Sequence, residues 1–86
     1  MKILKFNAVW CPGCLVSRPV WNEVLKEFPD IKITEYDYDI DEEEVAKYNV
    51  GDKLPVVIML DENDNEIKRL TGEKNKEEIL GFIKER

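Results

Sequence analysis

The chain has 86 residues, of which 43% are hydrophobic and 37% are charged, with only 4 glycines and 4 prolines. This length fits one small domain covering residues 1–86, and the composition excludes collagen-like and low-complexity chains. Thirteen basic and nineteen acidic residues give a net charge of −6, which excludes nucleic acid as the expected ligand. Histidine is absent, so Cys/His and Ser/His/Asp catalytic sites are excluded as well.

The chain carries no sequence signal for a membrane or for export. No apolar run approaches about 18 residues, the length of a membrane-spanning helix. Lysines interrupt residues 1–7, which therefore lack the continuous apolar region of a signal peptide. We expect a soluble, monomeric protein of the cytoplasm, where a close cysteine pair is more often catalytic or metal-binding than structural.

A strand and an amphipathic helix are predicted at the start of the chain. Apolar residues dominate positions 2–8 and turn residues follow at 10–13, which indicates a buried strand that ends in a turn. From Cys14 onward apolar residues recur every four positions, which predicts a helix of about 16 residues. Pro19 lies inside this helix and is expected to kink it. The alternative is a helix that begins only near Arg18.

A second strand and a short helix follow. Residues 31–38 alternate β-branched or aromatic residues with polar ones, a pattern typical of a strand. Asp41 and Glu44 are spaced as in a capping box and predict a helix that ends near Asn49. We interpret the acidic run at 37–44 as a solvated loop and helix start rather than a metal site, because carboxylates favour helix N-termini.

The last part of the chain predicts a hairpin and a final helix. Residues 54–60 form an apolar strand, and turn residues at 61–65 connect it to a strand over 67–71. Asn75 and Glu78 predict the capped start of the last helix. The complete order predicts an α/β domain whose four-stranded mixed sheet is flanked by three helices. The first two strands are expected to be parallel, joined by a right-handed crossover, and the last two antiparallel, with helices on both faces.

A cysteine pair lies where the first strand ends and the first helix begins. Unpaired N–H groups and the positive end of the helix dipole favour a thiolate at Cys11, the predicted nucleophile. Pro12 suits the first helical position, and its fixed φ helps to set the distance between the sulfurs. Cys14 lies one turn later on the same side, so it can attack a mixed disulfide and release the reduced partner.

Further features accompany this pair. They are the motif Trp10-Cys11-Pro12-Gly13-Cys14, Pro19 in the following helix, Leu54-Pro55 before the third strand and Gly72 after the fourth. Together they resemble the thioredoxin family over essentially the whole chain. The resemblance implies the minimal thioredoxin fold and a thiol–disulfide oxidoreductase that reduces disulfide-containing proteins.

The resemblance also implies how such a protein would work. Cys11 would attack, Cys14 would resolve, and their redox-active disulfide would need no bound cofactor. A thioredoxin-reductase-like donor would recharge the pair. The Leu54–Pro55 bond would be cis and packed beside the sulfurs, where its loop backbone receives the substrate chain.

Some residues depart from the family pattern. The chain begins directly at the central strand, so its size resembles glutaredoxins and miniature redoxins. Pro12-Gly13 reverses the Gly-Pro of thioredoxins. The glutathione-binding Gly-Gly-x-Asp turn of glutaredoxins is missing, and residues 71–74 read Thr-Gly-Glu-Lys instead, so glutathione is not the favoured partner.

A second departure concerns two charges beneath the cysteines. The buried aspartate of the family aligns with Lys5, and the lysine that pairs with it aligns with Glu35, so the two signs are exchanged. We hypothesise a partly buried pair below Cys14, with Lys5 lowering the pKa of that thiol and Glu35 able to accept its proton. The alternative is a lysine stem on apolar surface with its ammonium in water.

Three further residues and a rival function complete the predictions. Trp10 is expected to contact substrates, with a packing aromatic as the alternative. Asn7 is expected to form a hydrogen bond near the active-site loop, and Arg18 to be solvated rather than to bind phosphate or glutathione.

The rival function is a metal-binding or interaction module, in which two thiolates supply half of a tetrahedral zinc site.

Overall fold

The computed structural model describes residues 2–84, which contain four strands and three helices. In chain order these are β1 (Lys2–Asn7), α1 (Pro12–Lys26), β2 (Lys32–Asp37), α2 (Glu42–Lys47), β3 (Val56–Leu60), β4 (Glu66–Thr71) and α3 (Lys76–Lys84). The predicted order of elements is therefore confirmed. The boundaries differ from the predicted ones by one or two residues at most ends, where apolar periodicity is a weak guide.

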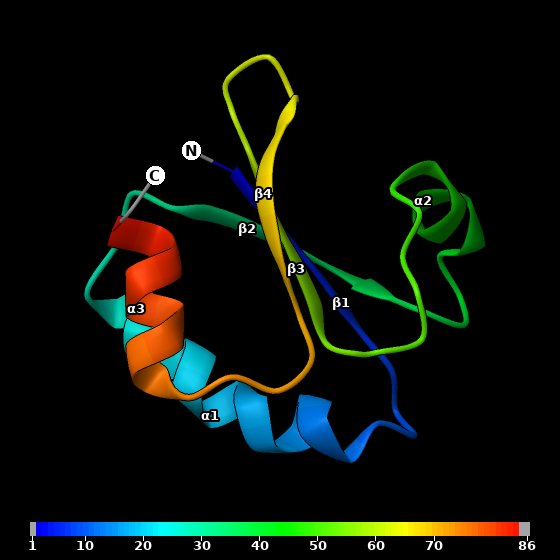
Figure 1. Ribbon diagram of the computed structural model, residues 1–86, viewed down its shortest axis with the longest axis horizontal. Coiled ribbons are helices and arrows are strands. Elements are labelled where there is room, and N and C mark those ends of the chain that lie inside the picture. Colours follow the sequence, from blue (N-terminus) through cyan, green and yellow to red (C-terminus); the bar gives the residue numbers. More distant parts are fainter. Residues whose placement is uncertain (1, 85–86) are drawn as a thin grey trace.

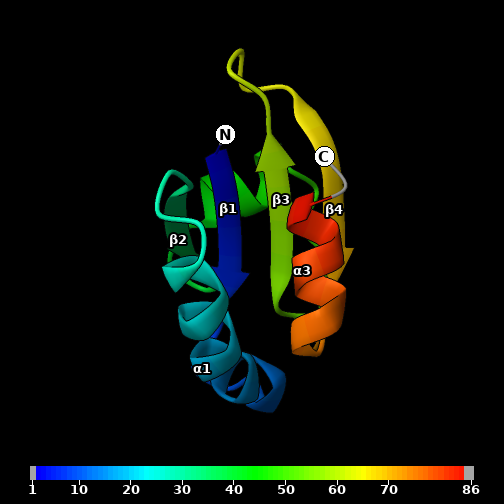
Figure 2. The same cartoon turned by 90° about the vertical axis from the view of Figure 1, so that its left-hand side faces the viewer.

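The four strands form one mixed sheet in the order β2-β1-β3-β4. β1 runs parallel to β2 and antiparallel to β3, and β4 is antiparallel to β3, as predicted. Figures 1 and 2 show α1 and α3 packed on one face of the sheet and α2 on the other. Every residue of β3 is buried, because this strand lies in the interior of the sheet with helices on both sides.

The sheet separates two hydrophobic cores, because successive side chains of a strand point to opposite faces. The core on the α2 face includes Leu4, Phe6, Ile58 and Leu60. The core beneath α1 and α3 includes Ile3, Trp21, Val24, Val57 and Ile79. The same alternation directs Lys5 and Asn7 toward α1, although neither is apolar.

The first helix begins earlier than its apolar periodicity indicates. Cys11 is its N-cap residue and Pro12 is its first residue. A backbone N–H at this position has no partner within a helix, so proline, which lacks one, loses no hydrogen bond here. The alternative start near Arg18 is therefore wrong. Pro12 occupies the first helical position as predicted, two residues before the apolar periodicity begins at Cys14. Pro19 lies inside the helix as predicted, and the kink expected there stays a prediction.

One of the two predicted capping boxes forms. At α3 the Asn75 side chain accepts the N–H of Glu78 at 2.8 Å, and the Glu78 carboxylate accepts the N–H of Asn75 at 3.5 Å. The box predicted at α2 is wrong: Asp41 is the N-cap residue, but its side chain makes no capping hydrogen bond and instead accepts the N–H of Asp37 at 2.7 Å. The turn after β2 thus competes for this carboxylate. Asn49, which follows α2, has the left-handed φ of 56° expected just beyond a helix end.

Candidate active site

Two free thiols meet at the N-terminus of α1. Cys11 and Cys14 are buried, with exposed fractions of 5% and 6%. The Cys11 sulfur accepts the N–H of Cys14 at 3.3 Å and its thiol donates to the Leu54 carbonyl at 3.4 Å. A helix N-terminus directs N–H groups and a positive dipole end at this sulfur, which stabilises negative charge there. The division between an attacking Cys11 and a resolving Cys14 stays a prediction.

A loop before β3 packs against the cysteine motif. The Leu54–Pro55 peptide bond is cis, as the resemblance implies, and the Leu54 carbonyl contacts Cys11. The N–H of Gly72 donates to the Pro55 carbonyl at 2.9 Å, and Gly72 has the left-handed φ of 85° that glycine adopts readily. A Cβ added to Gly13 would lie 3.5 Å from the Leu54 carbonyl oxygen. The loop therefore lies directly beside the motif.

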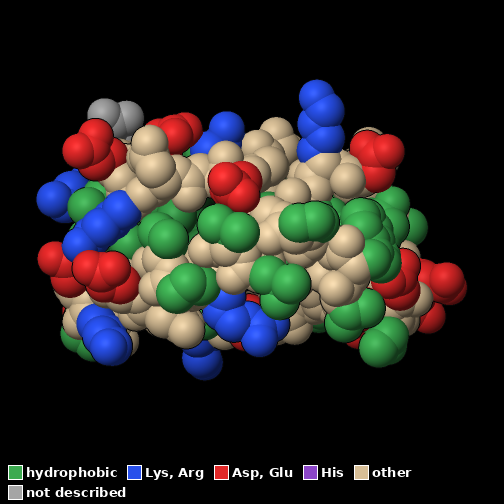
Figure 3. All heavy atoms as spheres, turned by 90° about the horizontal axis from the view of Figure 1, so that it is seen from below, with side chains coloured by type: hydrophobic (Ala, Val, Ile, Leu, Met, Phe, Trp, Pro, Cys, Tyr) green, Lys and Arg blue, Asp and Glu red, His purple; other side chains and the backbone are tan. Residues whose placement is uncertain are grey.

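An exposed apolar surface surrounds the nearly buried thiols. Hydrophobic side chains gather along the face that Figure 3 presents, where the start of α1 and the adjoining loops lie in Figure 1. The exposed members of this surface near the motif are Val9, Trp10, Leu15 and Val16. We call these four residues the apolar rim. An apolar surface at a reactive site is suited to bind a protein partner.

Trp10 is partly packed against its neighbours and partly exposed. It is 52% exposed, yet its Nε1–H donates to the Asp39 carboxylate at 2.9 Å and its ring meets Tyr38 edge-on at a centroid distance of 6.0 Å. One edge of the indole is thus anchored while the remainder faces solvent. Sequence reasoning missed Asp39, because nothing distinguishes it from its neighbours in an acidic run. Contact between Trp10 and a substrate stays a prediction.

The charge pair hypothesised beneath the cysteines is present. Lys5 is 3% exposed, and its Nζ lies 3.7 Å from Oε1 of Glu35, whose side chain is 58% exposed. The same Nζ lies 5.7 Å from the centroid of the Trp21 ring. The alternative, an ammonium in water, is wrong, because parallel pairing of Lys5 with Glu35 holds the side chain under α1. Burial lowers the pKa of Lys5, and the Glu35 carboxylate opposes this effect.

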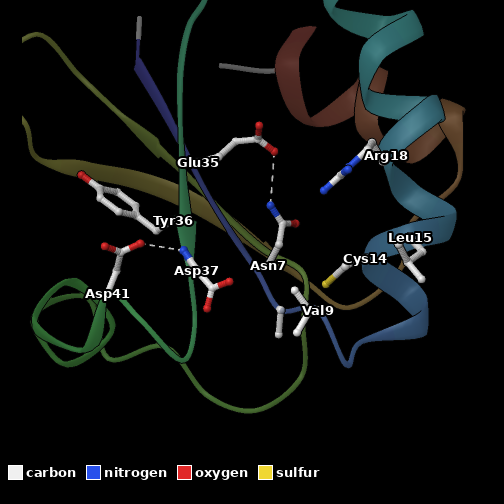
Figure 4. Close-up of a pocket in the computed structure, with 10 residues that line it drawn as sticks. Asn7, Val9, Cys14, Leu15, Arg18, Glu35, Tyr36, Asp37 and Asp41 are labelled. Atoms are coloured by element: carbon white, nitrogen blue, oxygen red, sulfur yellow. Dashed lines mark hydrogen bonds between the residues drawn. The ribbon is translucent and has the colours of Figure 1, made fainter.

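A pocket of about 450 Å³ is lined both by Cys14 and by Glu35, the exposed member of this charge pair. Asn7, Cys14, Arg18 and Glu35 are among the residues that line it, and Figure 4 shows their side chains converging. The amide of Asn7 donates to Glu35 Oε1 at 3.2 Å, so the hydrogen bond predicted for Asn7 forms beside the active-site loop. Its Oδ1 is buried without a partner among residues 2–84. Arg18 is exposed, as predicted.

The Cys14 thiol is strongly biased toward its neutral form. Burial, followed by the hydrogen bond with Cys11, raises the pKa of Cys14 to about 11. The Ala8 backbone and the charge of Lys5 act in the opposite direction. The hypothesis that Lys5 lowers this pKa is thus correct in sign, but burial is the larger effect.

Two further properties concern the described part of the chain. No helix within residues 2–84 is long and apolar enough to cross a membrane. The same residues hold no group of three or more histidine, cysteine, aspartate or glutamate side chains arranged to bind a metal ion.

Comparisons with known proteins agree with this architecture. The chain is 36% identical over 70 residues to thioredoxin H5 of Oryza sativa subsp. japonica, covering 81% of the chain and 50% of that protein. It is 32% identical over 81 residues to an H-type thioredoxin of Fagopyrum esculentum, covering 94% of the chain and 67% of the relative. The chain thus spans between half and two thirds of the length of these relatives.

A solved structure and a family model extend the similarity. Thioredoxin 1 of Thermosipho africanus superposes with a TM-score of 0.84 at 30% identity, covering 99% of this chain and 92% of that one. The family model described as thioredoxin matches residues 1–85. With the sheet order, the cysteine pair at the start of α1 and the adjacent cis-proline loop, these matches show that the chain belongs to the thioredoxin family.

Proposed function

We propose that this protein is a thiol–disulfide oxidoreductase that reduces disulfides in other proteins through its Cys11-Pro12-Gly13-Cys14 motif. The observation that carries the proposal is the pair of free thiols at the N-terminus of α1, where the Cys11 sulfur accepts the N–H of Cys14 at 3.3 Å. Hydrogen bonding at a helix N-terminus favours the thiolate, which is the nucleophile in disulfide exchange. Membership of the thioredoxin family supports the same activity.

The reaction proceeds in two exchange steps. The Cys11 thiolate attacks one sulfur of the substrate disulfide, which forms a mixed disulfide and expels the first substrate thiolate. Cys14 then loses its proton and attacks the Cys11 sulfur, which expels the second substrate thiolate and closes the Cys11–Cys14 disulfide. The substrate gains two electrons, its two thiolates take up protons, and a reductase returns two electrons to the protein.

The surface around the motif supports a protein as the substrate. The Leu54–Pro55 loop lies against Cys11, and we assign its backbone to bind the polypeptide chain that carries the disulfide. The apolar rim, which includes Trp10, would cover the flanking residues of that chain. A small polar disulfide would leave most of this apolar area uncovered, which favours protein substrates over glutathione.

Partner and compartment follow from the same chemistry. A reductase resembling thioredoxin reductase is the proposed electron donor. A monomer is the proposed active form, since one chain supplies both redox cysteines. The cytoplasm is the proposed compartment, since its thiol pool keeps such a pair reduced. Size-exclusion chromatography tests the monomer, and reduction by NADPH with purified thioredoxin reductase tests the donor.

Cysteine variants test the activity itself. We expect Cys11→Ser to abolish turnover of a disulfide-bonded protein, and Cys14→Ser to accumulate a covalent mixed disulfide with it, detectable by non-reducing electrophoresis and mass spectrometry. Cys14→Ser protein that forms no mixed disulfide would contradict the mechanism.

The direction of electron flow needs a separate measurement. An equilibrium redox titration, followed by tryptophan fluorescence, should show one two-electron transition near or below about −220 mV. A midpoint between about −180 and −120 mV would make the protein an oxidant or isomerase instead. Loss of the transition on binding zinc would favour the rival metal-binding module.

A further inference from the structure

A buried lysine beneath the active site is the starting observation. Lys5 lies in the middle of β1 with only 3% of its side chain exposed. Its one charged partner within 4.0 Å among the described residues is Glu35, at 3.7 Å, and that carboxylate is 58% exposed. Removing an ammonium from water destabilises the fold unless its charge is well compensated. The long, half-solvated pair compensates it only in part, so this lysine stands out as a candidate for a role beyond packing.

The position of Lys5 relates it to Cys14. Its ammonium lies 5.7 Å from the ring centroid of Trp21, on the buried face of α1 that also carries Cys14. The two groups act on each other, since the charge of Lys5 favours the Cys14 thiolate and that thiolate favours the charged form of Lys5. Because both are buried, solvent screens this attraction less than it would at the surface.

The resolving step requires the Cys14 thiol to become a thiolate. Burial raises the pKa of Cys14 to about 11, so the thiol holds its proton at neutral pH and is a poor nucleophile in that form. A cation beside it offsets part of the penalty on the thiolate. A cation cannot accept the proton, however, so a base is also required.

The pocket beside Cys14 provides that base. Figure 4 shows the Cys14 sulfur directed toward Asn7, whose amide donates to Glu35 Oε1 at 3.2 Å. This hydrogen bond holds the carboxylate at the pocket that Cys14 also lines. The exposed part of Glu35 then allows the proton to leave to solvent.

We propose that the buried ammonium of Lys5 stabilises the Cys14 thiolate during resolution, and that Glu35, held by Asn7, receives the proton that this thiol releases. The proposal rests on the proposed disulfide exchange. In the step, the proton moves from Cys14 to the Glu35 carboxylate, and the thiolate forms a bond to the Cys11 sulfur. The bond from Cys11 to the substrate sulfur breaks, and its electron pair leaves with the substrate thiolate. Lys5 acts through Cys14 and is a positioning residue.

Other charges near Cys14 bear on the pH dependence. The titratable and charged groups that line its pocket or contact it are Cys11 and Arg18 on or beside α1, Glu35, Tyr36 and Asp37 on β2, and Asp41 before α2, with Lys5 below. Arg18 and both aspartates are more accessible to solvent than Lys5, so their fields at the sulfur are more strongly screened. We therefore expect Lys5 to act more strongly on the Cys14 thiolate than Arg18 or either aspartate does.

A stopped-flow experiment separates the two exchange steps. The reduced protein reacts with 5,5′-dithiobis(2-nitrobenzoate), a coloured disulfide probe: attack by Cys11 releases one nitrothiobenzoate, and resolution by Cys14 releases the second. For Lys5→Met, the first release should stay within about twofold of the unmodified protein, since Cys11 performs it. The second release should slow about three- to tenfold at pH 7. Loss of a nearby cation raises the pKa of Cys14, so less of the thiol is ionised, and the greater nucleophilicity of the remaining thiolate compensates only in part.

The pH profile distinguishes electrostatics from damaged structure. The deficit of Lys5→Met should shrink as the pH rises toward the Cys14 pKa of about 11, whereas a distorted site would slow the step at every pH. Lys32→Met is the matched control, because it removes an exposed lysine from β2, and it should behave like the unmodified protein. Methionine has nearly the length of lysine and carries no charge to desolvate, so the variant should fold. If it does not, Lys5→Gln replaces it.

Glu35→Gln tests the proton acceptor. Its second release should slow at pH 7 and recover as the concentration of a buffer base such as imidazole is raised, while that of Lys5→Met should not recover. A second release within twofold of the unmodified protein for both folded Lys5 variants would overturn the role of Lys5, and no slowing in Glu35→Gln would overturn that of Glu35. A single equivalent released by the unmodified protein would instead overturn the proposed function.

Discussion

Trp10 has an exposed ring whose orientation is nevertheless restrained. Its indole N–H is bound by Asp39 and its edge is packed against Tyr38, so little conformational freedom remains for a partner to remove on binding. Exposed aromatic residues of this kind often dominate the energetics of an interface. At this scale, one side chain beside the nucleophile can therefore decide affinity without taking part in the chemistry.

A substitution separates these two contributions. Trp10→Ala should raise the KM for a disulfide-bonded protein about tenfold, which corresponds to about 1.4 kcal/mol of binding. Its reaction with a small disulfide probe should change less than twofold, because the Cys11 environment remains. Trp10→Phe keeps an aromatic ring but loses the bond to Asp39 and part of the indole's contact area, so its KM should lie between. An unchanged KM in Trp10→Ala would show that substrates bind elsewhere.

At the scale of elements, the two capping sequences behave differently. Asn75 and Glu78 exchange side-chain hydrogen bonds with each other's backbone, whereas the Asp41 carboxylate turns back to the N–H of Asp37. The spacing of residues is the same in both cases. What differs is the preceding segment, because α2 follows a turn in which the N–H of Asp37 donates to the Asp41 carboxylate.

The α3 cap should have a measurable effect on stability. Asn75→Ala removes the acceptor for the N–H of Glu78 and should lower the free energy of unfolding by about 1 kcal/mol in chemical denaturation. Asn75→Ser keeps a capping oxygen and should lose much less. Equal losses in both variants would mean that the side chain stabilises the fold by some contact other than the cap.

At the scale of the whole molecule, the buried thiol couples stability to pH. The pKa of Cys14 rises from 9.0 to about 11 on folding, so between these values the unfolded chain has lost a proton that the folded chain keeps. Folding stability must then fall as the pH rises through this interval. Lys5 contributes in the opposite direction. Burial lowers its pKa below 10.5, so the folded chain loses this proton before the unfolded chain does, and folding stability increases as the pH rises toward 10.5.

Denaturation at several pH values checks this balance. The reduced protein should lose stability between pH 9 and 11, and Lys5→Met should lose it more steeply because the opposing contribution is gone. Cys14→Ser has no thiol at this position and should lack that loss. A flat profile for reduced Lys5→Met would show that Cys14 titrates alike in the folded and unfolded chains.

Much of this protein could be predicted from sequence because local patterns carry the information. Apolar periodicity and turn residues determined the order of elements, and the spacing of Cys11 and Cys14 with Pro12 between them determined a motif at a helix start. A helix N-terminus creates the same electrostatic environment wherever it occurs, so the reactive pair could be recognised before any tertiary contact was known.

The family resemblance placed Lys5 and Glu35 beneath that pair, but only the tertiary structure decided how far each is buried and which other side chains contact them. Lys5 reads as a solvated lysine in any local window, and it is buried because pairing of β1 with β2 and the cover of α1 enclose it. Asp39 reaches Trp10 and Asn7 reaches Glu35 across 29 and 28 positions of sequence. Burial and long-range charge are properties of packing, and no local pattern of residues encodes them. The sequence by itself therefore determined the fold class and the reactive cysteines, while tertiary packing decided the electrostatics around them.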